Sequence, residues 1–282
     1  MTHSSPTPVP ISFEFFPPNT PVGDEKLKLV VQELGRLKPE FFSVTYGAGG
    51  GTRDKTLKTV QAIADTGFEA APHISCVGST REGVAATLAT YRAQRIKRIV
   101  ALRGDLPSGT AVTGEFRHAA ELVRFIRQTQ GADWTIEVAA YPEYHPGQRY
   151  AARDLQHYVD KVEAGATSAI TQFFYNADAY FHFVEQTQKL GASVPVAAGI
   201  MPFHNYARIA QFAARDGIDI PRWVALKMEG FLDDAASIRA FGLDVVAGLC
   251  ERLIAGGAPG LHFYTLNQSA LAVELCRRLR VG

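Results

Sequence analysis

The stretch Ile99-Val100-Ala101-Leu102-Arg103-Gly104-Asp105 decides the fold of this chain. Four apolar residues predict a buried strand, and the strand ends in a basic residue, a glycine and a carboxylate. Side chains two positions apart on a strand point to the same face, so we expect Arg103 and Asp105 to project together from its carboxyl end. Gly104 has no Cβ, which lets another backbone or a flat ligand approach closely.

The same succession of apolar strand, polar tip and helix recurs along the chain. Strands are expected over residues 11–16, 41–46, 70–77, 99–105, 135–141, 168–175, 194–201 and 261–267. Helices are expected over residues 24–38, 54–65, 115–128, 178–190, 206–214, 234–254 and 269–279, with one more opened by a capping box at Ser79-Thr80-Arg81-Glu82 and one ending at Gly165. Helical crossovers imply parallel strands, and eight units favour a closed (β/α)8 TIM barrel over an open doubly wound sheet.

Length and composition agree with a single α/β domain. We expect residues 1–10, rich in Ser, Thr and Pro, to form a flexible tail, and residues 11–282 to form one catalytic barrel. The net charge of +1 gives no reason to expect a nucleic-acid surface or a polybasic membrane anchor. Three widely spaced cysteines and the lack of a signal peptide or apolar span predict a cytoplasmic protein with free thiols.

Polar residues at the carboxyl ends of the expected strands are the candidate site residues, because barrel enzymes carry their active sites on that face. Any one of them could be a satisfied core group, but six on one rim favour a site: Glu14, Thr45, His73, Asp105, Tyr141 and Gln172. Glu14 lies in the aromatic strand Phe13-Glu14-Phe15-Phe16, where apolar surroundings favour a protonated carboxyl group and suit a general acid. The alternative for Glu14 is an ion pair with an Arg or Lys lining the barrel.

Two other patterns are weaker. The run Gly47–Gly51 fails both the dinucleotide fingerprint and the P-loop pattern, so a tight turn is the better interpretation. His73 and Cys76 are three apart and therefore on opposite faces of a strand, and the chain has no second cluster at metal-site spacing. We therefore expect no metal site.

Residues 141–146 and the helix after them could line a ligand site. The loop Tyr141-Pro142-Glu143-Tyr144-His145-Pro146 suits either a wall for a flat ligand or an ordinary proline-stiffened loop. Asp154, His157 and Lys161 share one helix face, which is either a solvated charged face or a grip on the phosphates or sugar of a cofactor.

Seven motifs, in order and spanning nearly the whole chain, resemble the methylenetetrahydrofolate reductase family. They are Ser12-Phe13-Glu14-Phe15-Phe16-Pro17-Pro18, Ser43-Val44-Thr45-Tyr46-Gly47-Ala48-Gly49-Gly50, Ala71-Pro72-His73, Leu102-Arg103-Gly104-Asp105, Ala140-Tyr141-Pro142-Glu143, Ile170-Thr171-Gln172-Phe173-Phe174 and Phe263-Tyr264-Thr265-Leu266-Asn267. The resemblance implies an FAD-containing (β/α)8 barrel that reduces 5,10-methylenetetrahydrofolate to 5-methyltetrahydrofolate, in support of methionine synthesis. A nicotinamide cofactor, NADH or NADPH, would deliver a hydride to flavin N5, and folate would then enter the same site in a ping-pong order.

The resemblance also implies roles for individual residues. Glu14 matches the family's general acid, and Asp105 matches a carboxylate beside the flavin that also contacts the pterin. The implied FAD-binding residues are Thr45, His73, Leu102, Arg103, Gly104, Asp105, His118, Ala140, Tyr141, His145, Asp154, His157 and Lys161. The implied substrate-binding residues are Glu14, Asp105, Gln172, Tyr206 and Gln268.

Two of these positions depart from the family pattern. Gln268 replaces an arginine thought to engage the folate glutamate tail, and Tyr206 stands where bacterial members have a stacking Phe. An amide cannot make the charged, bidentate grip of arginine on a carboxylate, so the affinity for the tail is in question.

The resemblance further implies a homo-oligomer, a dimer or tetramer, made of catalytic barrels without control by S-adenosylmethionine. Two alternatives stay open. One is another FAD-dependent barrel of the proline dehydrogenase kind, although residues 261–268 lack the arginines such a site needs. The other is a folate- or flavin-binding subunit that depends on a partner reductase.

Overall fold

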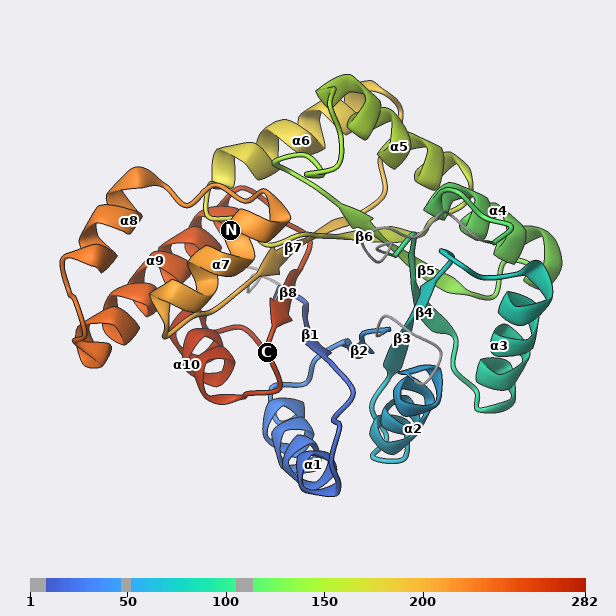
Figure 1. Ribbon diagram of the computed structural model, residues 1–282, viewed down its shortest axis with the longest axis horizontal. Coiled ribbons are helices and arrows are strands. Elements are labelled where there is room, and N and C mark those ends of the chain that lie inside the picture. Colours follow the sequence, from blue (N-terminus) through green and yellow to red (C-terminus); the bar gives the residue numbers. More distant parts are fainter. Residues whose placement is uncertain (1–8, 47–51, 105–113) are drawn as a thin grey trace, which may run out of the picture.

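Eight parallel strands form a closed barrel in the computed structural model, which describes residues 9–46, 52–104 and 114–282. Each strand pairs with the next, and the last pairs with the first, so the ring in the centre of Figure 1 has no free edge. The predicted (β/α)8 TIM barrel is confirmed. The strands are β1 (Ile11–Phe15), β2 (Phe41–Val44), β3 (Ala70–Ser75), β4 (Arg98–Leu102), β5 (Thr135–Ala140), β6 (Ser168–Thr171), β7 (Val196–Ile200) and β8 (Leu261–Tyr264).

Helices surround this ring on its outer side (Figure 1). They are α1 (Pro21–Gly35), α2 (Thr52–Ala64), α3 (Arg81–Ala93), α4 (Ala119–Gln130), α5 (Ala151–Glu163), α6 (Ala177–Lys189), α7 (Tyr206–Asp216), α8 (Arg222–Glu229), α9 (Ala235–Ala255) and α10 (Ala270–Leu279). Over the described residues, none of these helices is long and apolar enough to cross a membrane.

The structure corrects three details of the sequence prediction. The predicted strands extend too far at their carboxyl ends, most of all 168–175, whose ladder stops at Thr171. Helix α3 is capped by Thr80 instead of Ser79, because the Thr80 hydroxyl accepts from the backbone N–H of Gly83, whereas the Ser79 hydroxyl donates to the carbonyl of Ser75. Helix α8 was not predicted.

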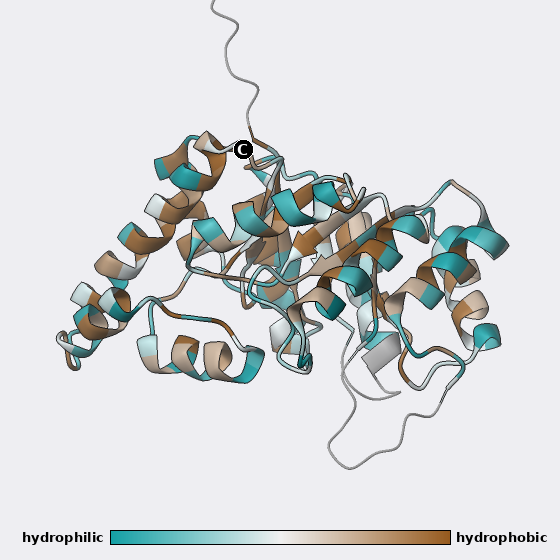
Figure 2. Ribbon diagram, turned by 90° about the horizontal axis from the view of Figure 1, so that it is seen from above, coloured by the Kyte–Doolittle hydropathy of each residue, from teal (hydrophilic) through white to brown (hydrophobic). Residues whose placement is uncertain are grey.

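The strands separate two apolar layers. Phe13 and Phe15 point outward and pack with Phe42 against the helices, at ring distances of 5.9 and 5.4 Å. Figure 2 shows the same division, with helices that carry teal and brown on different faces. A small apolar cluster that includes Phe41 and Val100 forms a second layer, separate from the main core.

The segment after β8 hydrogen-bonds to the end of β1, where the barrel closes. The Asn267 side chain donates to the carbonyl of Phe16 at 2.8 Å and accepts from the N–H of the same residue at 3.0 Å. The Thr265 hydroxyl donates to the carbonyl of Glu14 at 2.7 Å. These contacts hold the carboxyl end of β1, and therefore Glu14, against β8.

Candidate active site

Glu14 lies inside the barrel between two histidines. Its Oε2 atom is 3.4 Å from Nε2 of His73, on β3, and 3.7 Å from Nε2 of His262, on β8. The Glu14 side chain is 18% exposed, whereas His262 is fully buried. The Arg or Lys partner weighed as an alternative is not found among the described residues, because the close basic groups are both imidazoles.

Burial governs the protonation of His73. Removal from water lowers the pKa of the imidazole, the negative charge of Glu14 partly opposes this, and His262 adds to the lowering. Its Nε2 atom has no hydrogen-bond partner among the described residues. His73 was predicted to bind cofactor, and the structure places it beside the predicted general acid.

His262 was missed by the sequence reasoning. The alternation Leu261-His262-Phe263-Tyr264 carries the signal, because the apolar residues face the helices while His262 and Tyr264 face the interior. Burial, followed by the charge of Glu14, raises the pKa of Tyr264 well above its ordinary value, so this phenol stays protonated. Its hydroxyl donates to the carbonyl of Thr171 at 2.7 Å.

A cavity of about 180 Å³ opens at the carboxyl end of the barrel, between β4 and β5 and helices α4 and α5. We call it the β4–β5 pocket. It brings together ten of the predicted cofactor-binding residues: Leu102, Arg103, Gly104, His118, Ala140, Tyr141, His145, Asp154, His157 and Lys161.

Lys161 is the part-buried cation of this pocket. Its ammonium donates to the carbonyl of Ala139, and among the described residues no carboxylate lies within 4.0 Å of it. Burial lowers its pKa to about 8, against the opposing charges of Asp154 and Asp160. A cation that lacks an anionic partner here suits an anionic ligand.

Aromatic rings form the pocket wall. His118 and His157 stack at 4.8 Å, and burial, followed by the neighbouring His118, lowers the pKa of His157. Tyr141 packs edge-on to His145 at 4.8 Å. The Asp154 carboxylate accepts from the backbone N–H of His145 at 2.9 Å, so this predicted binding residue holds the loop in place.

Gly104 needs to be glycine for two reasons. Its φ is +84°, and a Cβ would lie 1.9 Å from the hydroxyl oxygen of Ser75. The close neighbour of Gly104 is therefore the side chain of Ser75, at the end of β3. This finding accounts for the glycine without any flat ligand.

The remaining predicted residues are more scattered. Asp105, like the run Gly47–Gly51, lies outside the described residues. Thr45 hydrogen-bonds to Phe15 through its backbone N–H, and the Gln172 side-chain oxygen accepts from the N–H that follows it. Tyr206 begins α7 and is not among the residues that line a pocket described here.

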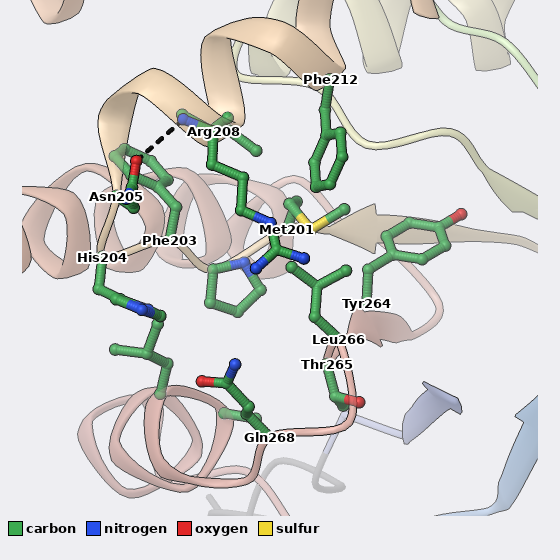
Figure 3. A pocket seen from close by; sticks show the side chains of 14 residues that line it. Met201, Phe203, His204, Asn205, Arg208, Phe212, Tyr264, Thr265, Leu266 and Gln268 are labelled. Atoms are coloured by element: carbon green, nitrogen blue, oxygen red, sulfur yellow. Dashed lines mark hydrogen bonds between the residues drawn. The ribbon is translucent and has the colours of Figure 1, made fainter. Parts of the chain in front are cut away.

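Gln268 lines a second, small pocket of about 30 Å³, between α7 and the segment after β8. Figure 3 shows Gln268 and Arg208 reaching into this space from opposite walls, with Leu266 between them. Among the described residues Arg208 has no carboxylate within 4.0 Å, and its guanidinium lies 5.5 Å from the ring of Phe212. A positive charge therefore faces Gln268 across the pocket.

The fold and this arrangement define a class. A closed parallel barrel with an acid between imidazoles and a pocket at its carboxyl end is the architecture of a (β/α)8-barrel enzyme. The family model described as methylenetetrahydrofolate reductase matches residues 3–280. The chain belongs to the methylenetetrahydrofolate reductase family, whose members are oxidoreductases.

Individual relatives support this family assignment. The 5,10-methylenetetrahydrofolate reductases of Salmonella typhimurium and Escherichia coli are each 39% identical over 272 residues, covering 96% of this chain and 90% of theirs. The Arabidopsis thaliana protein named methylenetetrahydrofolate reductase (NADH) 1 is 34% identical, over 95% of this chain and 48% of its own length.

One solved structure shares the fold. It is an uncharacterised protein from Clostridium thermocellum, described as binding two copies of 5-methyl-5,6,7,8-tetrahydrofolic acid. Its TM-score is 0.65 at 17% identity, and the match covers 97% of this chain and 96% of that one.

Proposed function

We propose that this protein reduces 5,10-methylenetetrahydrofolate to 5-methyltetrahydrofolate, with FAD as its cofactor, NADH or NADPH as donor and Glu14 as general acid. Family membership supports the reaction. The observation that carries the acid assignment is the position of Glu14, a largely buried carboxyl group at the carboxyl end of the barrel with imidazoles on either side.

The residues of the β4–β5 pocket fit FAD. Lys161 offers a part-buried cation for a phosphate, and the imidazoles and Tyr141 offer flat walls. When bound, FAD would relay a hydride from NADH or NADPH to the folate in two half-reactions that share one site. Thr45 and His73, which do not line this pocket, and Asp105, which lies outside the described residues, remain proposed contacts.

The chain's own part in the chemistry centres on Glu14. Reduction requires the five-membered ring of the folate to open, and a protonated carboxyl group can supply the proton. Gln172 is proposed to contact folate and nicotinamide in turn. Gln268 and Tyr206 are proposed substrate contacts, with Arg208 as a source of positive charge in the pocket that Gln268 lines.

An anaerobic absorbance series tests the reaction as a whole. We expect NADH or NADPH to bleach an oxidised-flavin band and methylenetetrahydrofolate to restore it. Bleaching without recovery would contradict the folate assignment while keeping a flavin enzyme. Folate or flavin binding without turnover would favour a subunit that needs a partner reductase.

Replacing Glu14 by Gln separates the two half-reactions. We expect Glu14→Gln to slow folate reduction by about 10²–10⁴-fold, because the amide cannot donate the proton, while oxidation of the nicotinamide continues. Stopped-flow measurement of each half-reaction checks this. Equal loss in both half-reactions would indicate a damaged cofactor site, and unchanged folate reduction would remove Glu14 as the acid.

Two further features are proposed for the protein as a whole. Its three cysteines are free and buried, which suits the reducing cytoplasm. A dimer or tetramer is expected from the family, and light scattering on the purified protein would measure its size.

A further inference from the structure

The histidine that the sequence reasoning missed, His262, is held by contacts on several sides. The hydroxyl of Ser12 lies 2.7 Å from Nδ1 of His262. Ser12 and His262 are register partners on the adjacent strands β1 and β8, so the closure of the barrel itself brings them together. Both residues are buried.

Packing fixes the plane of the same ring. The imidazole of His262 stacks on Phe41 with centroids 5.8 Å apart, and Tyr264 packs edge-on to it at 5.4 Å. With Nδ1 on Ser12, the other nitrogen faces Ser43 Oγ at 3.4 Å and Glu14 Oε2 at 3.7 Å. If Ser12 donates to Nδ1, then Nε2 carries the hydrogen and directs it toward Glu14.

His73 offers a contrast on the other side of the carboxyl group. It is closer to Glu14, at 3.4 Å against 3.7 Å, but its Nε2 atom has no hydrogen-bond partner among the described residues, and burial lowers its pKa. The titratable groups that face Glu14 in the described part of the chain are thus His73 from β3, and His262 and Tyr264 from β8. Within the described part of the chain, His262 is the imidazole of the two whose nitrogen is hydrogen-bonded to a side chain.

We propose that His262, oriented by Ser12, is a positioning residue for Glu14, presenting Nε2–H to the carboxylate that remains after proton transfer. This inference rests on the proposed function. The separation of 3.7 Å is longer than a hydrogen bond, and catalytic hydrogen bonds are often long without substrate and tighten in the complex. No proton leaves His262 in this step, because Glu14 alone gives up a proton and regains it from solvent.

The sign of the effect follows from this geometry. A hydrogen-bond donor to a carboxylate stabilises its charged form, so losing that donor disfavours the charged form. Weakening the contact should move the alkaline limb of folate reduction upward by about one pH unit and lower its plateau rate by about tenfold. A merely structural residue would lower the rate or the yield of protein without moving the limb.

Ser12→Ala is the decisive variant, because it removes one oxygen and leaves the imidazole in place. We expect the upward shift of the limb in folate reduction and no change in nicotinamide oxidation. Thr187→Val is the matched control: its buried hydroxyl donates to Val184 within α6, away from the barrel interior, and both half-reactions should match the parent protein.

A pair of histidine variants tests the second link. The amide nitrogen of His262→Gln can reach the place of Nε2, whereas that of His262→Asn reaches the place of Nδ1. We expect His262→Gln to retain most of the rate and the parent pH profile, and His262→Asn to lose both. Should the histidine variants fail to fold, Ser12→Ala alone decides.

An unshifted pH profile in Ser12→Ala would overturn the inference. Measuring Glu14→Gln in parallel keeps the two proposals apart. If Glu14→Gln abolishes folate reduction and Ser12→Ala leaves the profile unchanged, only the role of His262 fails. If Glu14→Gln has no effect, the acid assignment itself fails.

Discussion

Lys161 is the residue whose charge state most directly controls the β4–β5 pocket. Burial lowers its pKa to about 8, so the ammonium is charged below that pH and loses its charge above it. A bound anion would favour the charged form. The charge is therefore available at neutral pH and sensitive to alkaline conditions.

We expect the affinity for FAD to fall as pH rises from about 7 to 9. In Lys161→Met the affinity should be lower by about tenfold at pH 7 and vary less over this range, because a neutral side chain replaces the titrating charge. Titration of the apoprotein by flavin fluorescence measures both. An affinity that declines identically in the parent and the variant would assign the pH effect to another group.

At this scale, the sequence was most informative where motifs are local. Ten predicted cofactor-binding residues do line one pocket, although binding itself is untested. His262 was missed because its importance depends on Ser12 and Glu14, which are about 250 positions away and approach it only when β8 closes on β1. Likewise, the residues next to Glu14 in the sequence do not show whether its basic partner is a histidine or an arginine.

At the level of elements, β7 contains a glycine that lets Tyr264 reach across it. A Cβ at Gly199 would lie 2.1 Å from the carbonyl oxygen of Thr171 and 2.8 Å from the Tyr264 ring. The first of these atoms belongs to the backbone of β6 and cannot turn aside. Gly199 therefore permits the hydrogen bond between Tyr264 and Thr171.

Gly199→Ala should destabilise the protein by about 1–3 kcal/mol, because overpacking forces the neighbouring strands apart. Gly248→Ala is the matched control in α9, since a Cβ there meets nothing within 4 Å. It should stabilise the protein by about 0.5–1 kcal/mol, as expected for an open helical position. Urea unfolding compares the two, and equal stabilities would show that β7 can adjust.

The elements themselves were largely predictable. Alternation separated Phe13 and Phe15 from Glu14, and the spacing of apolar residues located most helices. The predicted strand 168–175 extended too far because the buried aromatic residues Phe173 and Phe174 look like strand although they lie beyond the ladder. Helix α8 was missed because eight residues give too short a pattern to separate from a loop.

At the scale of the whole molecule, the barrel separates stability from the site. Its lower end holds Arg98, which contacts the carboxylates of Glu69 at 2.9 Å and of the buried Glu137, and lies 4.4 Å from the ring of Phe41. In barrels this amino-terminal face contributes to stability, and the opposite face carries the chemistry. The ion pairs of Arg98 therefore stabilise the fold at the amino-terminal face of the barrel.

Arg98→Met should destabilise the protein by about 3–5 kcal/mol, because Glu137 would be left buried without its charged partner. Adding Glu137→Leu should recover part of this loss, since the unpaired charge is then gone. Thermal unfolding of the two variants measures the coupling. Ligand affinities of the folded protein should stay at parent values in both, and a selective loss of affinity would contradict the separation.

The hydrogen bonds between the Asn267 side chain and the Phe16 backbone, which hold the segment after β8 against the end of β1, have a consequence for folding during synthesis. On the ribosome, β1 emerges first of the eight strands and β8 last, so one edge of β1 has no strand to pair with until β8 has been synthesised. Glu14 and Ser12 belong to β1, and His262 belongs to β8. The centre of the site therefore forms only when β8 pairs with β1. A nascent chain that stalls before β8 carries Glu14 without His262.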